Sequence, residues 1–105
     1  MKFKINIFEQ NIHLITNEKK FQKIIDKSEY CLDISEHTGC CLSIDNNIYI
    51  GHFTNRDDIL VHECTHASLF IMDNISENVT SDSELQPYLI QTLFRECKKL
   101  LLNAK

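Results

Sequence analysis

The first residues of the chain alternate between polar and apolar side chains. In the stretch KFKINIF, Phe3, Ile5 and Ile7 fall on one side of a period-two pattern, and the apolar run IHLIT follows after the polar residues 9–11. A period of two is typical of strands that bury one face. We therefore expect a β-hairpin at the N-terminus.

A second alternating stretch, CCLSIDNNIYIG, covers residues 40–51. The polar residues 45–47 interrupt it, and Asp and Asn are common in tight turns. This pattern predicts a second hairpin. The apolar residues expected to share one face of it are Leu42, Ile44, Ile48 and Ile50.

Between the two hairpins lies a short helical pattern. Asn17 is a good N-cap residue, and Phe21, Ile24 and Ile25 follow at helical spacing. This helix is expected to end near Ser28.

The second half of the chain is predicted to be helical. The sequence TNRD, residues 54–57, is a Thr-x-x-Asp capping signal before an apolar run, and it predicts a helix from about Arg56 to Asp73. The polar residues 74–82 are expected to form a loop. Residues 83–102 then form a second long helical pattern, in which Pro87 is tolerable only near the start or as a kink.

The order ββ, α, ββ, α, α predicts an α+β fold, with a small mixed or antiparallel sheet of two hairpins packed against helices. At 105 residues, we expect one domain over residues 1–105, with no room for a separate substrate or cofactor domain.

Charge and cysteine content narrow the classes of function. The formal net charge is -4 and the basic residues are scattered, which argues against a nucleic-acid partner. No apolar run is long enough for a membrane span or a signal peptide. The five cysteines show no paired spacing, so we expect buried thiols in a reducing, cytoplasmic protein.

The run ILVHECTHASLFIMD carries the candidate chemistry. His62 and His66 are four residues apart, so on a helix both imidazoles leave one face and suit two corners of a zinc site. Glu63 is rotated by about 100° and would lie beside the metal as a general base. The structural alternative is a surface helix with two solvated histidines, which partial burial of the helix would disfavour.

Zinc held by two histidines needs a third protein ligand. The acidic candidates downstream are Asp73, Glu77, Asp82 and Glu84. Asp73 lies about 10 Å beyond His66 on the same helix and cannot turn back to the metal. Glu84 opens the next helix, and the intervening loop is long enough to return it.

These residues resemble a known pattern. His62-Glu63-x-x-His66 with Glu84 downstream looks like the gluzincin motif of thermolysin-like metallopeptidases. LVHECTHA with SELQPYL is similar to small HExxH proteins of bacteriophages and bacteria. The resemblance implies that His62, His66 and Glu84 bind zinc, that Glu63 is the catalytic base, and that Tyr88 matches a tyrosine of the last helix.

Tyr88 also lies one turn after Glu84, where its hydroxyl could bond a ligand or the oxyanion. The alternative is an aromatic side chain packed between the last two helices. The chain departs from thermolysin in lacking an acidic residue four positions after Glu84 and in lacking a second domain, which leaves the substrate open.

Zincins usually place a strand beside the motif helix, to which a peptide can add. By resemblance, IYIGHF, residues 48–53, is expected to do this. Gly51 would allow a close backbone approach and His52 would be a second electrophile, or else Gly51 ends the strand and His52 is a solvated loop residue. His13 and His37 are expected at the surface.

The sequence thus predicts a zinc-dependent hydrolase, a minimal metallopeptidase acting on a peptide or protein substrate, in the host cytoplasm if the gene is viral. The alternative is a non-catalytic interaction module, with or without zinc, that binds a protein partner. A homodimer would be compatible with a shallow site, although no residue points to one.

Overall fold

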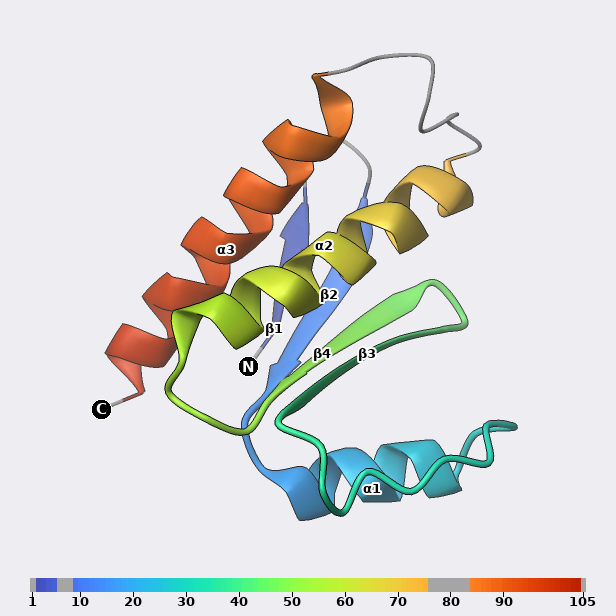
Figure 1. Cartoon of the computed structure of the whole chain (residues 1–105). Helices are drawn as coiled ribbons and strands as arrows, with labels where there is room; N and C mark the ends of the chain where they lie inside the picture. Colours follow the sequence, from blue (N-terminus) through green and yellow to red (C-terminus); the bar gives the residue numbers. More distant parts are fainter. Residues whose placement is uncertain (1, 6–8, 76–83, 105) are drawn as a thin grey trace.

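The elements follow one another much as the sequence predicts. A computed structural model describes residues 2–5, 9–75 and 84–104 (Figure 1). Within these ranges the elements are β1 (Lys2–Ile5), β2 (Gln10–Ile15), α1 (Glu18–Asp26), β3 (Gly39–Ile44), β4 (Asn47–His52), α2 (Asp57–Asn74) and α3 (Leu85–Asn103). The α+β class and both hairpins are confirmed. The expected loop lies mostly outside the described residues.

The two hairpins join into one sheet with the strand order β1-β2-β4-β3. Pairing is antiparallel within each hairpin, and parallel where β2 meets β4. The sheet is therefore mixed, and β3 is an edge strand. Helices α2 and α3 lie on one face, whereas α1 lies on the other (Figure 1).

The turn of the second hairpin corrects the predicted register. Asp45 and Asn46 both have positive φ, 49° and 66°, which is typical of a two-residue hairpin turn. Leu42 therefore pairs with Tyr49, and its side chain faces α1. Ile48 faces α2 and α3 instead. The prediction that these apolar residues share one face is wrong, because a shift of one residue exchanges the faces of a strand.

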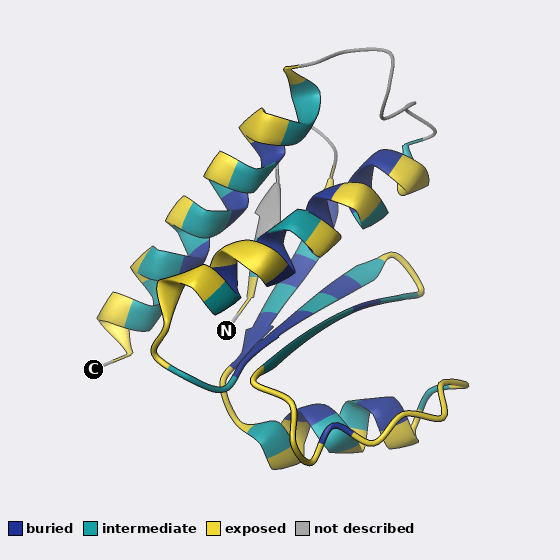
Figure 2. Ribbon diagram, in the orientation of Figure 1, coloured by how far each residue is buried: buried dark blue, intermediate teal, exposed yellow. Residues whose placement is uncertain are grey.

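Each face of the sheet has its own core (Figure 2). The buried residues beneath α2 and α3 are Ile12, Leu14, Ile48, Ile50, Leu60, Cys64, Ala67, Ile71, Met72, Leu89, Leu93 and Cys97. Those on the α1 side are Ile15, Phe21, Ile25, Ile34 and Leu42. The larger core fixes α2 on the sheet, and with it the motif residues.

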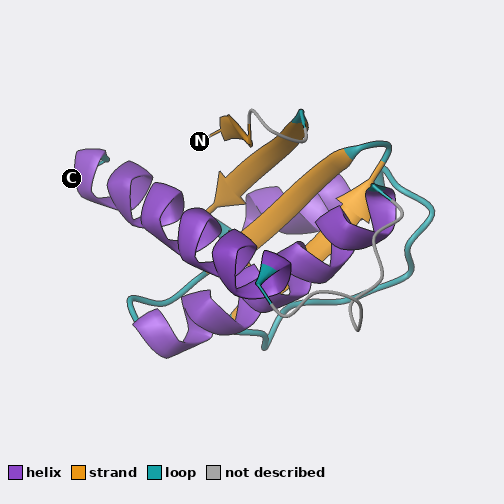
Figure 3. Cartoon of the chain, turned by 90° about the horizontal axis from the view of Figure 1, so that it is seen from above, coloured by secondary structure: helices purple, strands orange, loops and turns teal. Residues whose placement is uncertain are grey.

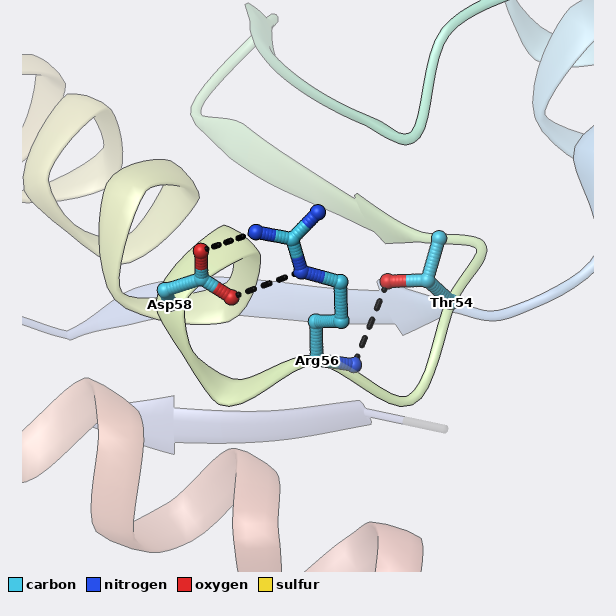
Figure 4. A network of polar contacts seen from close by, with 3 residues as sticks. All are labelled: Thr54, Arg56 and Asp58. Carbon is cyan, nitrogen blue, oxygen red and sulfur yellow. Dashed lines mark hydrogen bonds and ion pairs between the residues drawn. The ribbon is translucent and has the colours of Figure 1, made fainter.

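The cap of α1 is confirmed: the Asn17 side chain accepts a hydrogen bond from the Lys20 backbone N–H at 3.0 Å. The predicted cap of α2 is wrong. Its N-cap residue is Arg56, which makes no side-chain capping bond. Thr54 Oγ1 instead accepts from the Arg56 backbone N–H at 3.3 Å (Figure 4). The Arg56 guanidinium binds Asp58 in the first turn, at 2.6 and 3.1 Å.

Helix α3 begins with Pro87 in its first turn and packs against α2. Figure 3 shows that the two helices cross at an angle. Gln86 donates to Ser68 Oγ at 3.3 Å near one end of the contact. Lys98 pairs with Asp57 at 3.1 Å near the other. Among the described residues, no helix has the length and apolar character needed to cross a membrane.

Candidate functional site

His62 and His66 stand on the outer face of α2. Their Nε2 atoms are 3.1 Å apart and their ring centroids 4.8 Å apart. Two nitrogens bound to one tetrahedral zinc lie about 3.3 Å apart, since each Zn–N bond is 2.0–2.1 Å. The pair therefore fits two corners of a zinc site. It equally fits a hydrogen bond between the imidazoles, in which one Nε2 donates and the other accepts.

Both imidazoles are exposed to solvent. The expectation that the histidines are partly buried is therefore wrong, and their exposure agrees with the alternative of two solvated histidines on a surface helix. The argument for a metal rests on the direction of the two Nε2 atoms and on the carboxylate next to them.

Glu63 is the buried member of the motif, with 6% of its surface exposed. It points toward the start of β3, where a Cβ on Gly39 would meet Glu63 Oε2 at 3.0 Å. Burial raises the pKa of the Glu63 carboxyl, while His62, His66 and His37 act to lower it. A carboxylate with a raised pKa is a better proton acceptor near neutral pH than an exposed one.

Glu63 opens onto a hollow of about 500 Å³ between α2 and the chain segment that leads into β3. The residues that line it are Glu36, His37, Thr38, Gly39, Asp58, Ile59, His62 and Glu63. His37 is exposed, as expected, but its place beside Glu63 could not be predicted. No local pattern marks it, since only tertiary packing joins residues 36–39 to α2.

The structure does not place Glu84 or Tyr88 among the residues that line the hollow. Glu84 is the exposed N-cap residue of α3. The described part of the chain contains no group of three or more His, Cys, Asp or Glu side chains that could hold a metal ion. The role of Glu84 as third ligand therefore stays a prediction.

Tyr88 is 45% exposed and lies about half a turn around α3 from Cys97, which is buried in the same core as Cys64 of α2. It is not buried between the two helices, so that alternative is wrong. Its proposed hydrogen bond to a ligand or oxyanion remains untested.

The strand predicted to receive a peptide is the wrong one. β4, which holds most of residues 48–53, pairs with β2 on one side and β3 on the other, so it has no open edge. Gly51 does not end the strand, and it does not leave room for the backbone of a substrate to approach. A Cβ there would meet the ring of Phe53 at 2.6 Å and that of Phe21 at 2.9 Å.

The open edge next to α2 belongs to β3. Thr38 C=O accepts from the Phe53 backbone N–H at 3.1 Å, so it points toward β4. In an antiparallel pair these directions alternate, so the backbone groups of Gly39, Cys41 and Ser43 point away from β4. The Tyr30 hydroxyl donates to Ser43 C=O at 3.1 Å, so within the described ranges of the chain the end near Glu63 is the part of the edge without such a partner.

His52 is not a solvated loop residue, because it lies in β4 and pairs with Gly39 of β3. Its role as a second electrophile stays a prediction. It is 3% exposed, and its Nδ1 has no hydrogen-bond partner among the described residues. Burial lowers the pKa of His52, Asp57 raises it, and Lys98 lowers it. His52 thus belongs to the packing between β4 and the ends of α2 and α3.

This burial predicts that the stability of the protein falls in mild acid. As the pH falls below about 6.5, the unfolded chain protonates its histidine at position 52 more fully than the folded protein does, because burial lowers the pKa of His52. The free energy of unfolding therefore falls by up to about 1.4 kcal/mol per pH unit. Urea titrations of the wild-type and H52Q proteins between pH 8 and 5.5 measure this. H52Q is expected to show the shallower slope; equal slopes would contradict the assignment.

The cysteines differ in burial. Cys64 and Cys97 are buried, as expected for the thiols, and Cys40 and Cys41 are half-buried. Cys31 is exposed, so the expectation of buried thiols fails there. All five are free thiols.

Comparisons of this chain with protein-family models, curated proteins and solved structures gave no match.

Proposed function

We propose that this protein is a small zinc-dependent hydrolase, a metallopeptidase in which His62 and His66 bind the metal and Glu63 is the general base. The observation that carries the proposal is the 3.1 Å separation of the two Nε2 atoms beside a buried carboxylate. Glu84 is proposed as the third ligand on the resemblance to gluzincins. A bound zinc ion would acidify a water molecule and polarise a carbonyl group.

Glu63 is suited to hold and move a proton. Its raised pKa favours proton uptake, and its side chain lies in a hollow that a substrate can reach. The carboxylate takes a proton from the attacking water and passes it to the leaving amine nitrogen. Gly39 allows the carboxylate to lie directly against β3, because any Cβ there would meet Oε2.

A peptide substrate is proposed to pair with the free edge of β3 near Gly39 and Cys41. Backbone hydrogen bonds to an edge strand bind an extended peptide with little dependence on its sequence. Such a peptide would pass over the hollow that holds Glu63. This arrangement supports an endopeptidase that acts on unfolded or flexible segments.

Zinc binding is the first test. Wild-type protein is expected to bind one zinc ion, and H66A to lose affinity by more than the 10- to 100-fold typical of an outer-shell partner. Titration calorimetry and metal analysis after dialysis measure both. H13Q is the matched control, since His13 stacks on Tyr49 on the opposite face of the sheet and should leave zinc binding unchanged.

Cleavage of a pool of internally quenched peptides then distinguishes the hydrolase from the two non-catalytic alternatives. Zinc binding with cleavage supports the hydrolase. Zinc binding without cleavage would indicate a non-catalytic zinc module, and the absence of zinc binding would indicate a metal-free interaction protein.

A further inference from the structure

The imidazole of His37 lies at the rim of the hollow and has no role in the proposed reaction so far. His37 lines the hollow together with Glu63 and His62, from the segment just before β3. It also lies within electrostatic range of the Glu63 carboxyl, whose pKa it acts to lower. The side chain therefore faces the same space that a substrate would enter.

The backbone of His37 is fixed although its side chain is exposed. Its N–H donates to Ile34 C=O at 2.9 Å. Ile34 is fully buried against α1, and its own N–H donates to Gln22 Oε1 at 3.0 Å. These contacts anchor the turn that presents His37.

The His37 ring is available to a ligand. Across the described residues, it forms no hydrogen bond and no ion pair, and it interacts with the Asp33 carboxylate only through electrostatic attraction at longer range. The Asp58 carboxylate on the opposite side of the hollow is bound by Arg56. The rim also carries Glu36, which can only accept hydrogen bonds when ionised. A negative charge that develops in the hollow would therefore be drawn toward His37.

Resting on the proposed function, we infer that His37 is a catalytic residue that contacts the substrate: an imidazole N–H donates to the carbonyl oxygen of the scissile bond as negative charge develops on it. Water adds to the carbonyl carbon, its proton goes to Glu63 and then to the leaving amine nitrogen, and the C–N bond breaks. His37 keeps its own proton throughout. A donor that strengthens its bond in the transition state raises kcat more than it changes KM.

The test compares the zinc-loaded wild-type protein with H37A, H37Q and the control H13Q on one cleaved peptide. H37A is expected to lose on the order of 10²-fold in kcat, with KM within about twofold, because that is the usual effect of removing one oxyanion donor. H37Q retains an N–H donor and should recover part of the loss. H13Q should match wild type.

A binding measurement gives a readout independent of turnover. A phosphonamidate analogue of the same peptide, which mimics the tetrahedral transition state, should bind H37A more weakly by the same factor as the loss in kcat/KM. An uncleaved peptide of the same length should bind both proteins equally.

The outcomes separate the two proposals. A wild-type protein that cleaves, together with an H37A protein of equal kcat, overturns the role of His37 alone. A loss confined to KM, or equal loss of analogue and uncleaved peptide, also overturns it, because His37 would then only bind the ground state. A wild-type protein that binds zinc and cleaves nothing overturns both proposals.

Discussion

Replacing Glu63 by glutamine is expected to abolish peptide hydrolysis while leaving zinc binding intact. Glutamine has nearly the same shape, so it fits between α2 and Gly39, but it cannot accept the proton of the attacking water. General-base catalysis contributes roughly 10²–10⁴-fold, so kcat should fall by that factor. Initial rates on a cleaved peptide, with zinc content measured on the same preparation, give the result.

The matched control is E29Q, which removes an exposed carboxylate in the segment after α1. It changes the net charge by the same amount and should retain the wild-type rate. An E63Q protein that cleaves as fast as wild type would refute Glu63 as the base. A loss of zinc in E63Q would instead show that Glu63 is needed to form the metal site.

Replacing Gly51 by alanine is expected to destabilise the protein by about 2 kcal/mol or more. The added methyl group would overlap the rings of Phe53 and Phe21, and Phe21 is fully buried. If the added methyl group met no other atom, alanine should instead stabilise the protein by about 0.4–1 kcal/mol, because alanine lowers the conformational entropy of the unfolded chain. Urea denaturation followed by circular dichroism distinguishes the two signs.

The double variant G51A/F53L provides the control for this mechanism. Phe53 makes the closest approach, 2.6 Å, so its smaller replacement should relieve part of the overlap. The double variant should therefore lose less stability than the sum of the two single variants. Strict additivity would show that the Phe53 ring is not the source of the cost.

The periodic parts of the fold could be predicted from sequence. The Asn17 cap, both hairpins, the motif helix and the position of Pro87 depend on interactions within a few residues, and the structure has them as expected. The register of the second hairpin could not be predicted, because it depends on whether two or three residues form the turn. That difference moved Leu42 to the opposite face.

The predictions about the site that failed depend on contacts between segments that are far apart in the sequence. The parallel pairing of β2 with β4 placed residues 48–52 inside the sheet and left β3 as the edge beside α2. The same packing brought His37 to Glu63 and buried His52 among the helix ends. No sequence pattern around these residues indicates which residues they contact in the folded protein.

What the sequence determined by itself is the relation among His62, Glu63 and His66, because 3.6 residues per turn puts two imidazoles on one face and turns the glutamate aside. Tertiary structure decided the environment of that motif: which strand edge it faces, that the carboxylate is buried while the imidazoles are exposed, and which imidazole shares its hollow. Helix geometry is local, whereas burial and strand order depend on how all the elements pack together.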